Sequence, residues 1–317
     1  MTQLEFWQTG EKVSIREGFG RVLNYAATQR DDFVLFDADV AGGTGAKPFV
    51  QENPQRVIQF GIAEQNMMAA AAGFSDCGII PVVSTFASFG VMRAHEQFRT
   101  AICYANRNVK LCCSHIGLDT GPDGATAQML EDLATMRAIP NVTVISPADA
   151  NEFMQAFLAM LDHTGPVYLR IGRSDNPIIA DGKSDFKIGK AQRLTEGNDI
   201  TIIATGVMVE RALNVAEQLK NNEKISARVI NLSTIKPLDQ TEILLAAQQT
   251  NGIVTAEDHN VCGGMGSAVA EFLAENHPTK MKRVGVNDQF GKSGEPDELA
   301  KFFHIDEASI YQACLSI

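Results

Sequence analysis

The sequence of 317 residues lacks the features that mark several large classes of protein. No apolar run approaches the roughly 20 residues that span a bilayer, and the stretch MTQLEFWQTGEKVS has no basic segment followed by an apolar one. We therefore expect neither a membrane span nor a secretory signal. Positive charge is scarce, because 27 Lys and Arg face 38 Asp and Glu, for a formal charge of −11. Such a surface repels phosphate backbones and anionic lipids, so we expect no binding to nucleic acids or membranes.

Motifs of common catalytic and metal sites are also missing. The sequence has no P-loop, HExxH, GxSxG or CxxC motif, and AGGTG (41–45) does not match the dinucleotide-binding GxGxxG. The cysteines lie in apolar stretches without zinc-site spacing, so we expect reduced, buried thiols, no bound metal, and a cytoplasmic location. They are Cys77, Cys103, Cys112, Cys113, Cys262 and Cys314.

Short apolar runs alternate with amphipathic helical patterns along the whole chain. This alternation predicts an α/β protein with two three-layer α/β/α domains and mainly parallel sheets. Expected strands are 32–40, 79–87, 109–117, 142–148, 166–172, 199–206, 225–233, 251–258 and 282–288. Expected helices are 15–29, 63–75, 90–105, 127–138, 149–162, 208–221, 238–248 and 264–276, with Asp149 and Asn151 as candidate N-caps.

The stretch 178–192, IIADGKSDFKIGKAQ, is polar and has no helical period. It has the composition of a linker. We therefore place the domain boundary near residue 185, giving domains 1–185 and 186–317.

Glu64 is the most informative single residue. It stands in QFGIAEQNMMAAAAGF, at the start of a helix otherwise composed mainly of Ala, Met and Phe. One interpretation is a carboxylate that caps the amides of the first helical turn. The other is a carboxylate in an apolar pocket, suited to exchange a proton with a ligand nitrogen.

Polar, glycine-containing loops follow several predicted strands, where open α/β sheets bind ligands. His115 and Asp123 share the loop SHIGLDTGPDGAT (114–126), which is either an ordinary solvated loop or the polar rim of a substrate funnel. Phe86 and Phe89 follow a strand and belong either to the core or to a ligand shelf.

Basic side chains at the sheet edge leave two interpretations open. Arg170 and Arg173, in RIGRSDN (170–176), are either solvated loop charges or a fork that grips a phosphate. In the second half, VCGGMGSAVAEF (261–272) either permits a tight strand-to-helix turn or binds an anion. His259 is either a hydrogen-bonded strand-end residue or a ligand-facing one.

In their order, these segments resemble the C-terminal portion of transketolases. FDADV, RVIQFGIAEQNMMAAAAGF, STFASF, SHIGLDTGPDGAT, PNVTVISPADANE and PVYLRIGRSDN follow that family's pyrimidine-binding domain. TAEDHNVCGGMGSAVAE and RVGVNDQFGKSG are similar to its C-terminal domain, and the resemblance spans residues 12–315. It implies the thiamine-diphosphate-binding fold and the transfer of a two-carbon ketol unit between sugar phosphates.

The resemblance also implies residue roles. Glu64 matches the glutamate that hydrogen-bonds N1′ of the cofactor's aminopyrimidine and promotes loss of the C2 proton. The cofactor-binding set it implies is Asp39, Glu64, Phe86, Phe89 and Met92. The substrate set is His115 and Asp123 for the donor hydroxyls, with His115 also catalytic, and Arg173 for the phosphate.

Two departures from the family pattern limit how far the family's residue roles apply to this chain. Where the family usually has DGxTHQ, this chain has DGATAQ, so Ala127 replaces a histidine that hydrogen-bonds substrate. The family's GDG, which with an Asn holds Mg²⁺ and the diphosphate, is absent. The resemblance therefore implies a partner, an N-terminal transketolase subunit with the magnesium site, in an α₂β₂ heterotetramer.

Two alternatives stay open beside a split transketolase. The first is another thiamine-diphosphate enzyme subunit, such as a deoxyxylulose-phosphate-synthase-like chain or the β subunit of a 2-oxoacid dehydrogenase, which takes a decarboxylated acyl donor. The second is a non-catalytic partner subunit that keeps the fold.

Overall fold

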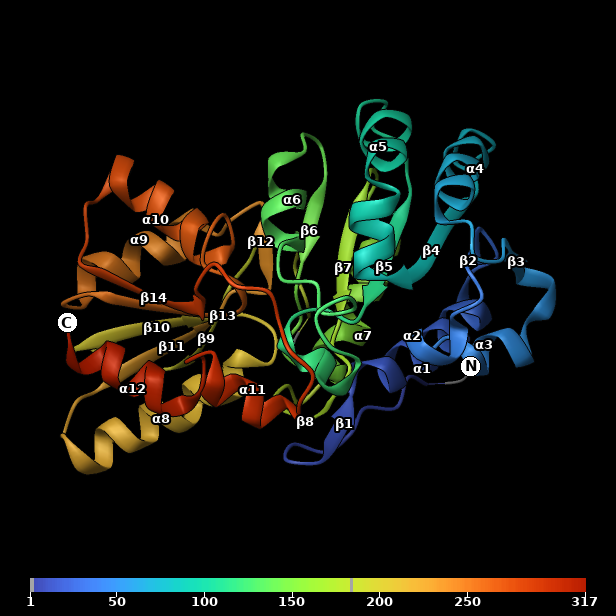
Figure 1. Ribbon diagram of the computed structural model, residues 1–317. Helices are drawn as coiled ribbons and strands as arrows, with labels where there is room; N and C mark the ends of the chain where they lie inside the picture. Colours follow the sequence, from blue (N-terminus) through green and yellow to red (C-terminus); the bar gives the residue numbers. More distant parts are fainter. Residues whose placement is uncertain (1–2, 183–184) are drawn as a thin grey trace.

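The computed structural model describes residues 3–182 and 185–317, so part of the predicted linker, residues 183–184, lies outside the described residues. Two parallel-rich sheets, each covered by helices on both faces, lie side by side (Figure 1). The predicted α/β class with mainly parallel sheets is confirmed. In the described part of the chain, no helix is long and apolar enough to cross a membrane.

The larger sheet has seven strands in the order β12-β6-β7-β5-β4-β2-β3. All neighbours pair in parallel except β12, which runs antiparallel to β6. The strands are β2 (Phe33–Asp37), β3 (Val57–Gln59), β4 (Ile80–Phe86), β5 (Lys110–Ser114), β6 (Thr143–Ile145), β7 (Val167–Ile171) and β12 (Thr234–Lys236). The central strands are buried on both faces, which explains their nearly continuous apolar runs.

Helices cover both faces of this sheet. One face carries α1 (Ile15–Gln29), α3 (Lys47–Glu52) and α7 (Ala150–Asp162); the other carries α4 (Glu64–Asp76), the helical segment 88–103 and α6 (Asp132–Ala138). The predicted N-cap Asp149 is confirmed, because its carboxylate accepts from the Glu152 amide at 2.8 Å.

The smaller sheet has the order β14-β13-β10-β11-β9, parallel except for β9. Its strands are β9 (Gln192–Thr195), β10 (Ile200–Ala204), β11 (Ala227–Asn231), β13 (Ile253–Asn260) and β14 (Met281–Val286). Helices α8 (Met208–Asn222), α11 (Pro296–Phe302) and α12 (Glu307–Leu315) cover one face, and α9 (Gln240–Gln249) and α10 (Met265–Asn276) the other. Short elements complete the chain: β1 (Lys12–Ser14) paired with β8 (Asp175–Pro177), α2 (Ala41–Thr44), and 3₁₀ turns at Pro54–Arg56 and Leu118–Asp123.

Besides elements that were not predicted, such as β3, β12, α11 and α12, three predictions differ from the structure. The helix expected at 90–105 is mostly π-helical, with Ser88–Arg93 and Phe98–Cys103 on either side of α5 (His95–Gln97). The helix expected at 127–138 begins only at Asp132. The prediction of buried thiols is wrong for Cys77 and Cys262, which are exposed because each lies in a turn at the surface.

Candidate active site

Neighbouring parallel strands of the larger sheet bring most of the predicted site residues to one edge. Asp39 follows β2, Phe86 ends β4, His115 follows β5 and Arg173 follows β7, and these four strands are adjacent. Glu64 begins α4, the helix that follows the neighbouring strand β3. The carboxyl ends of parallel strands in open α/β sheets are the usual place for ligands.

Glu64 is almost completely buried and forms an ion pair. Its side chain is 3% exposed, and both carboxylate oxygens accept from Nη1 of Arg93 at 3.1 Å. The guanidinium carbon of Arg93 lies 4.5 Å from the centre of the Phe89 ring. The carboxylate is therefore held by a neighbouring side chain rather than spent on capping its own helix. Sequence reasoning missed Arg93, which lies 29 residues away from Glu64.

An aromatic stack lies beside this pair. The rings of Phe86 and Phe89 are 5.7 Å apart and nearly parallel, and the ring of His115 stacks on Phe86 at 3.7 Å. Gly43 permits this arrangement, because a Cβ there would lie 2.7 Å from the Phe86 ring. The three predicted residues therefore form one continuous surface.

His115 is oriented from both sides of its ring. Nε2 lies 3.1 Å from Asp123 Oδ2, and Nδ1 lies 2.9 Å from the Ser114 hydroxyl. Burial lowers the pKa of His115 to about 4, against the opposing attraction of Asp123. The imidazole is therefore neutral at pH 7, with Nε2 donating to the carboxylate. His115 and Asp39 both have positive φ, at 61° and 62°, a backbone conformation rare outside glycine.

Two arginines converge at the next part of the edge. Arg173 Nη2 lies 3.4 Å from Asp123 Oδ1, and Arg16 Nη1 donates to the Gly43 carbonyl at 3.3 Å. Burial and the nearby charge of Arg173 lower the pKa of Arg16. The Nε–H groups of both arginines are buried without a partner among the described residues. Arg16 and Arg173 bring two like charges together at this edge, and Asp119, Asp123 and Asp175 act on the charge of Arg16 from nearby.

Arg16 was not predicted from the sequence. It lies in the first turn of α1, directly after the β1 strand, and α1 packs against one face of the larger sheet. The sequence around Arg16 shows only that it stands two residues after Ser14, the N-cap of a helix. That position alone does not mark Arg16 as a site residue.

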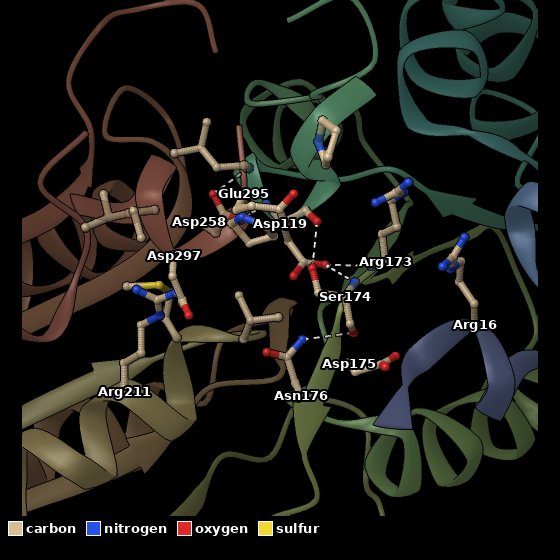
Figure 2. A pocket seen from close by; sticks show the side chains of 17 residues that line it. Arg16, Asp119, Arg173, Ser174, Asp175, Asn176, Arg211, Asp258, Glu295 and Asp297 are labelled. Atoms are coloured by element: carbon tan, nitrogen blue, oxygen red, sulfur yellow. Dashed lines mark hydrogen bonds and ion pairs between the residues drawn. The ribbon is translucent and has the colours of Figure 1, made fainter. Parts of the chain in front are cut away.

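A cavity of about 450 Å³ opens beside these arginines, between the two sheets (Figure 2). The larger-sheet side contributes Arg16, Asp119, Arg173 and Ser174; the C-terminal half contributes residues including Arg211, Asp258 and Pro296. In Figure 2, Arg16 and Arg173 lie side by side at one end, and Asp119 and Asp258 lie together near the middle. Both halves of the chain therefore line the space next to the candidate anion site.

Two residues of the predicted cofactor-binding set, Asp39 and Met92, lie at the surface, as does Ile62. Ile62 is 79% exposed and Met92 is 45% exposed; in the chain, Ile62 lies two residues before Glu64 and Met92 directly before Arg93. Asp39 is exposed, and its amide donates to the Gln59 side chain at 2.9 Å.

Two candidates turn out to be buried structural residues. Arg170 is no part of a phosphate fork: it is 2% exposed and forms a two-pronged pair with Asp132, at 2.7 and 3.0 Å. Residue 170 lies within β7, whereas Arg173 lies beyond its end. His259 is fully buried, and its Nδ1 donates to the Asn260 carbonyl at 2.6 Å.

The glycine-led segment 261–272 is occupied by the protein itself. The amides of Met265 and Gly266, at the start of α10, donate to the Glu257 carboxylate at 2.6 and 2.9 Å. Burial raises the pKa of Glu257 to about 7. The helix N-terminus therefore binds an internal carboxylate, and the glycines provide the turn.

Comparisons with known proteins identify the family of the chain. Residues 11–178 match the pyrimidine-binding domain of transketolase, and residues 189–310 match the transketolase C-terminal domain. A putative transketolase C-terminal section from Methanocaldococcus jannaschii is 42% identical over 95% of both chains. The subunit SqwH of a 6-deoxy-6-sulfo-D-fructose transketolase from Clostridium sp. (strain MSTE9) is 41% identical over 92% of this chain and 90% of its own.

A solved structure extends the match to three dimensions. A split-gene transketolase, described as an inactive β4 tetramer, superposes with a TM-score of 0.88 and 38% identity, covering 96% of this chain and 97% of the other. The chain belongs to the transketolase family and corresponds to its C-terminal portion, the pyrimidine-binding domain followed by the C-terminal domain.

Proposed function

We propose that this chain is the C-terminal subunit of a split, thiamine-diphosphate-dependent transketolase that moves a two-carbon ketol unit from a ketose phosphate to an aldose. The observation that carries this proposal is the continuity of the site. The buried Glu64 carboxylate, the Phe86–Phe89 stack and the oriented His115 follow one another along one sheet edge.

The residues present fit the aminopyrimidine of thiamine diphosphate. The Glu64 oxygens have the capacity to bond a ring nitrogen as well as Arg93, and the stacked phenylalanines offer a flat apolar surface of matching shape. Asp39 and Met92 border this surface in the proposed arrangement. When bound, the cofactor supplies the nucleophile for the ketose carbonyl and carries the two-carbon unit.

In the proposed reaction, the residues of the candidate site have distinct roles. Glu64 exchanges a proton at N1′ of the aminopyrimidine. Neutral His115, fixed by Ser114 and Asp123, hydrogen-bonds donor hydroxyls and is positioned to move a proton there. Arg173, with Arg16, binds the substrate phosphate through the guanidinium groups that line the cavity.

We further propose an N-terminal partner subunit that holds Mg²⁺ and the diphosphate, assembled with this chain as an α₂β₂ heterotetramer in the cytoplasm. Three observations support it. The relatives that match over nearly their whole length are named a C-terminal section and a subunit; the sequence has no GDG; and Ile62 and Met92 expose apolar surface beside Glu64. We also propose that the chain divides into domains of residues 1–185 and 186–317.

Reconstitution tests the proposal. The chain is mixed with the candidate N-terminal subunit, thiamine diphosphate and Mg²⁺, and ketose phosphates are compared with pyruvate as donors. We expect turnover of a ketose phosphate and an aldose, with activity lost by about 10²–10⁴ in Glu64→Ala. Turnover of pyruvate alone assigns a different thiamine-diphosphate reaction. Absence of cofactor binding in the assembled complex assigns a non-catalytic role.

A further inference from the structure

Asp258, at the end of β13 in the C-terminal half, bonds the loop that carries His115 and Asp123. Its Oδ1 accepts from the Leu118 amide at 2.8 Å, and its Oδ2 accepts from the Asp119 amide at 2.9 Å. The side chain is buried, and Figure 2 shows it directly beside Asp119. The carboxylate therefore fixes two consecutive peptide groups of a loop that belongs to the other half of the chain.

The loop backbone is shaped to lie against this carboxylate. Gly117 has a φ of 62°, and a Cβ at this position would lie 2.2 Å from Asp258 Oδ2. Only glycine combines this conformation with so close an approach. The loop is anchored again near its end, where the Gln128 amide group donates to the Gly121 and Lys292 carbonyls.

A second carboxylate, that of Asp119, links Asp258 to the backbone of Arg173. Asp119 Oδ2 accepts from the amides of Arg173 and Ser174, at 2.6 and 3.0 Å, and the Ser174 hydroxyl donates to the Asp119 carbonyl at 2.9 Å. Asp258 therefore holds Asp119, and Asp119 holds the backbone of Arg173. The Arg173 side chain in turn reaches Asp123, the partner of His115.

We propose that Asp258 is a positioning residue, which through Asp119 sets the place of Arg173 and of the His115–Asp123 pair for a phosphorylated substrate. The C-terminal domain then contributes to substrate binding, in addition to any role in assembly. This inference rests on the proposed function, because it assumes that Arg173 binds the substrate phosphate.

The arrangement is costly for a contact with no role beyond packing. Two carboxylates are adjacent, and burial together with the charge of Asp119 raises the pKa of Asp258 to about 6. Apolar residues would join two domains at lower cost. Accepting two N–H groups on one rigid side chain, however, fixes a loop in a single geometry, and displacements near 1 Å at a binding site can reduce activity about 100-fold.

The test compares D258N with D239N. Asp239 is a matched control, because it is also a buried carboxylate of the C-terminal half that accepts two backbone amides, from Glu242 and Ala191, away from the cavity. In the reconstituted complex, we expect D258N to raise the KM for the ketose phosphate at least about tenfold. The kcat and the affinity for thiamine diphosphate should change less than about threefold, and D239N should leave all three unchanged.

Hydrogen exchange of the isolated chain tests independently whether these carboxylates hold the loop backbone in place. D258N should speed amide exchange at 118–119 and at 173–174. D119A removes the single oxygen that accepts both amides, so it should speed exchange at 173–174 only and still raise the KM. D119A also serves if D258N does not fold. Two results would overturn the inference. One is an active wild-type complex whose KM neither variant changes; the other is amide exchange at 173–174 that stays unchanged in the variants. An inactive wild-type complex counts against the proposed function, while the exchange data still report on the connection.

Discussion

Removing one partner of the buried ion pair between Arg170 and Asp132 should strongly destabilise the fold, whereas removing one partner of a surface pair of similar length should not. The shortest distance is 2.7 Å in this pair, with side chains 2% and 0% exposed. Replacing Arg170 by Met leaves the Asp132 carboxylate buried with the Tyr168 hydroxyl as its remaining short contact, at 2.6 Å. Breaking one side of such a pair costs about 3–5 kcal/mol of unfolding free energy.

A double-mutant cycle with urea unfolding, followed by circular dichroism, measures this cost. The variant with both Arg170→Met and Asp132→Leu should lose far less than the sum of the two single losses, because no charge is then left unpaired. Glu271→Gln is the surface control: its pair with Arg137 is also 2.7 Å long, but Glu271 is 65% exposed, so we expect a loss below about 1 kcal/mol. Single losses below about 1 kcal/mol for the buried pair, or additive losses, would refute the reasoning.

Three further predictions concern the site and its support. Arg16→Gln should raise the KM for a phosphorylated donor more than for its unphosphorylated counterpart; equal effects would remove Arg16 from the phosphate site. Gly43→Ala places a methyl group about 2.7 Å from the Phe86 ring, so it should cost about 1–3 kcal/mol in thermal unfolding and weaken cofactor binding in a titration of the complex. Burial lowers the pKa of Lys110 to about 7, so the unfolded state binds more protons above pH 7 and folding becomes more favourable as pH rises. Relative to Lys110→Met, the wild-type chain should therefore gain about 2 kcal/mol of stability between pH 7 and pH 9; a constant difference would show that the buried amine does not titrate there.

The sequence predicted the fold because its signals are local. Apolar runs and helix caps such as Asp149 are read within a few residues, and nearly every long element lies within a few residues of its predicted range. The antiparallel edge strand β12 was missed because it crosses from the C-terminal half to join the larger sheet. The π-helical segment was predicted as a helix, since residue periodicity does not separate i+4 from i+5 hydrogen bonding.

The candidate site was only partly predictable, because many of its contacts join residues that are far apart in the sequence. Glu64 and His115 stand out within their own segments, but the partners that orient the site come from distant parts of the chain. Arg93 reaches Glu64 across 29 residues, and Asp258 reaches the His115 loop across about 140. Arg170 and Arg173 stand in the same short segment of the sequence. Only the end of β7 separates the buried ion pair of Arg170 from the side chain of Arg173, which is proposed to bind phosphate.

The most direct test of the proposed function is the rate at which bound thiamine diphosphate exchanges its C2 proton for deuterium. The exchange is followed by NMR after acid quench, in the complex with the N-terminal subunit and Mg²⁺, without any sugar. If the Glu64 carboxylate of this chain activates a cofactor held by its partner, Glu64→Gln should slow the exchange at least about 100-fold while the cofactor stays bound. Equal rates in the two complexes would contradict that role.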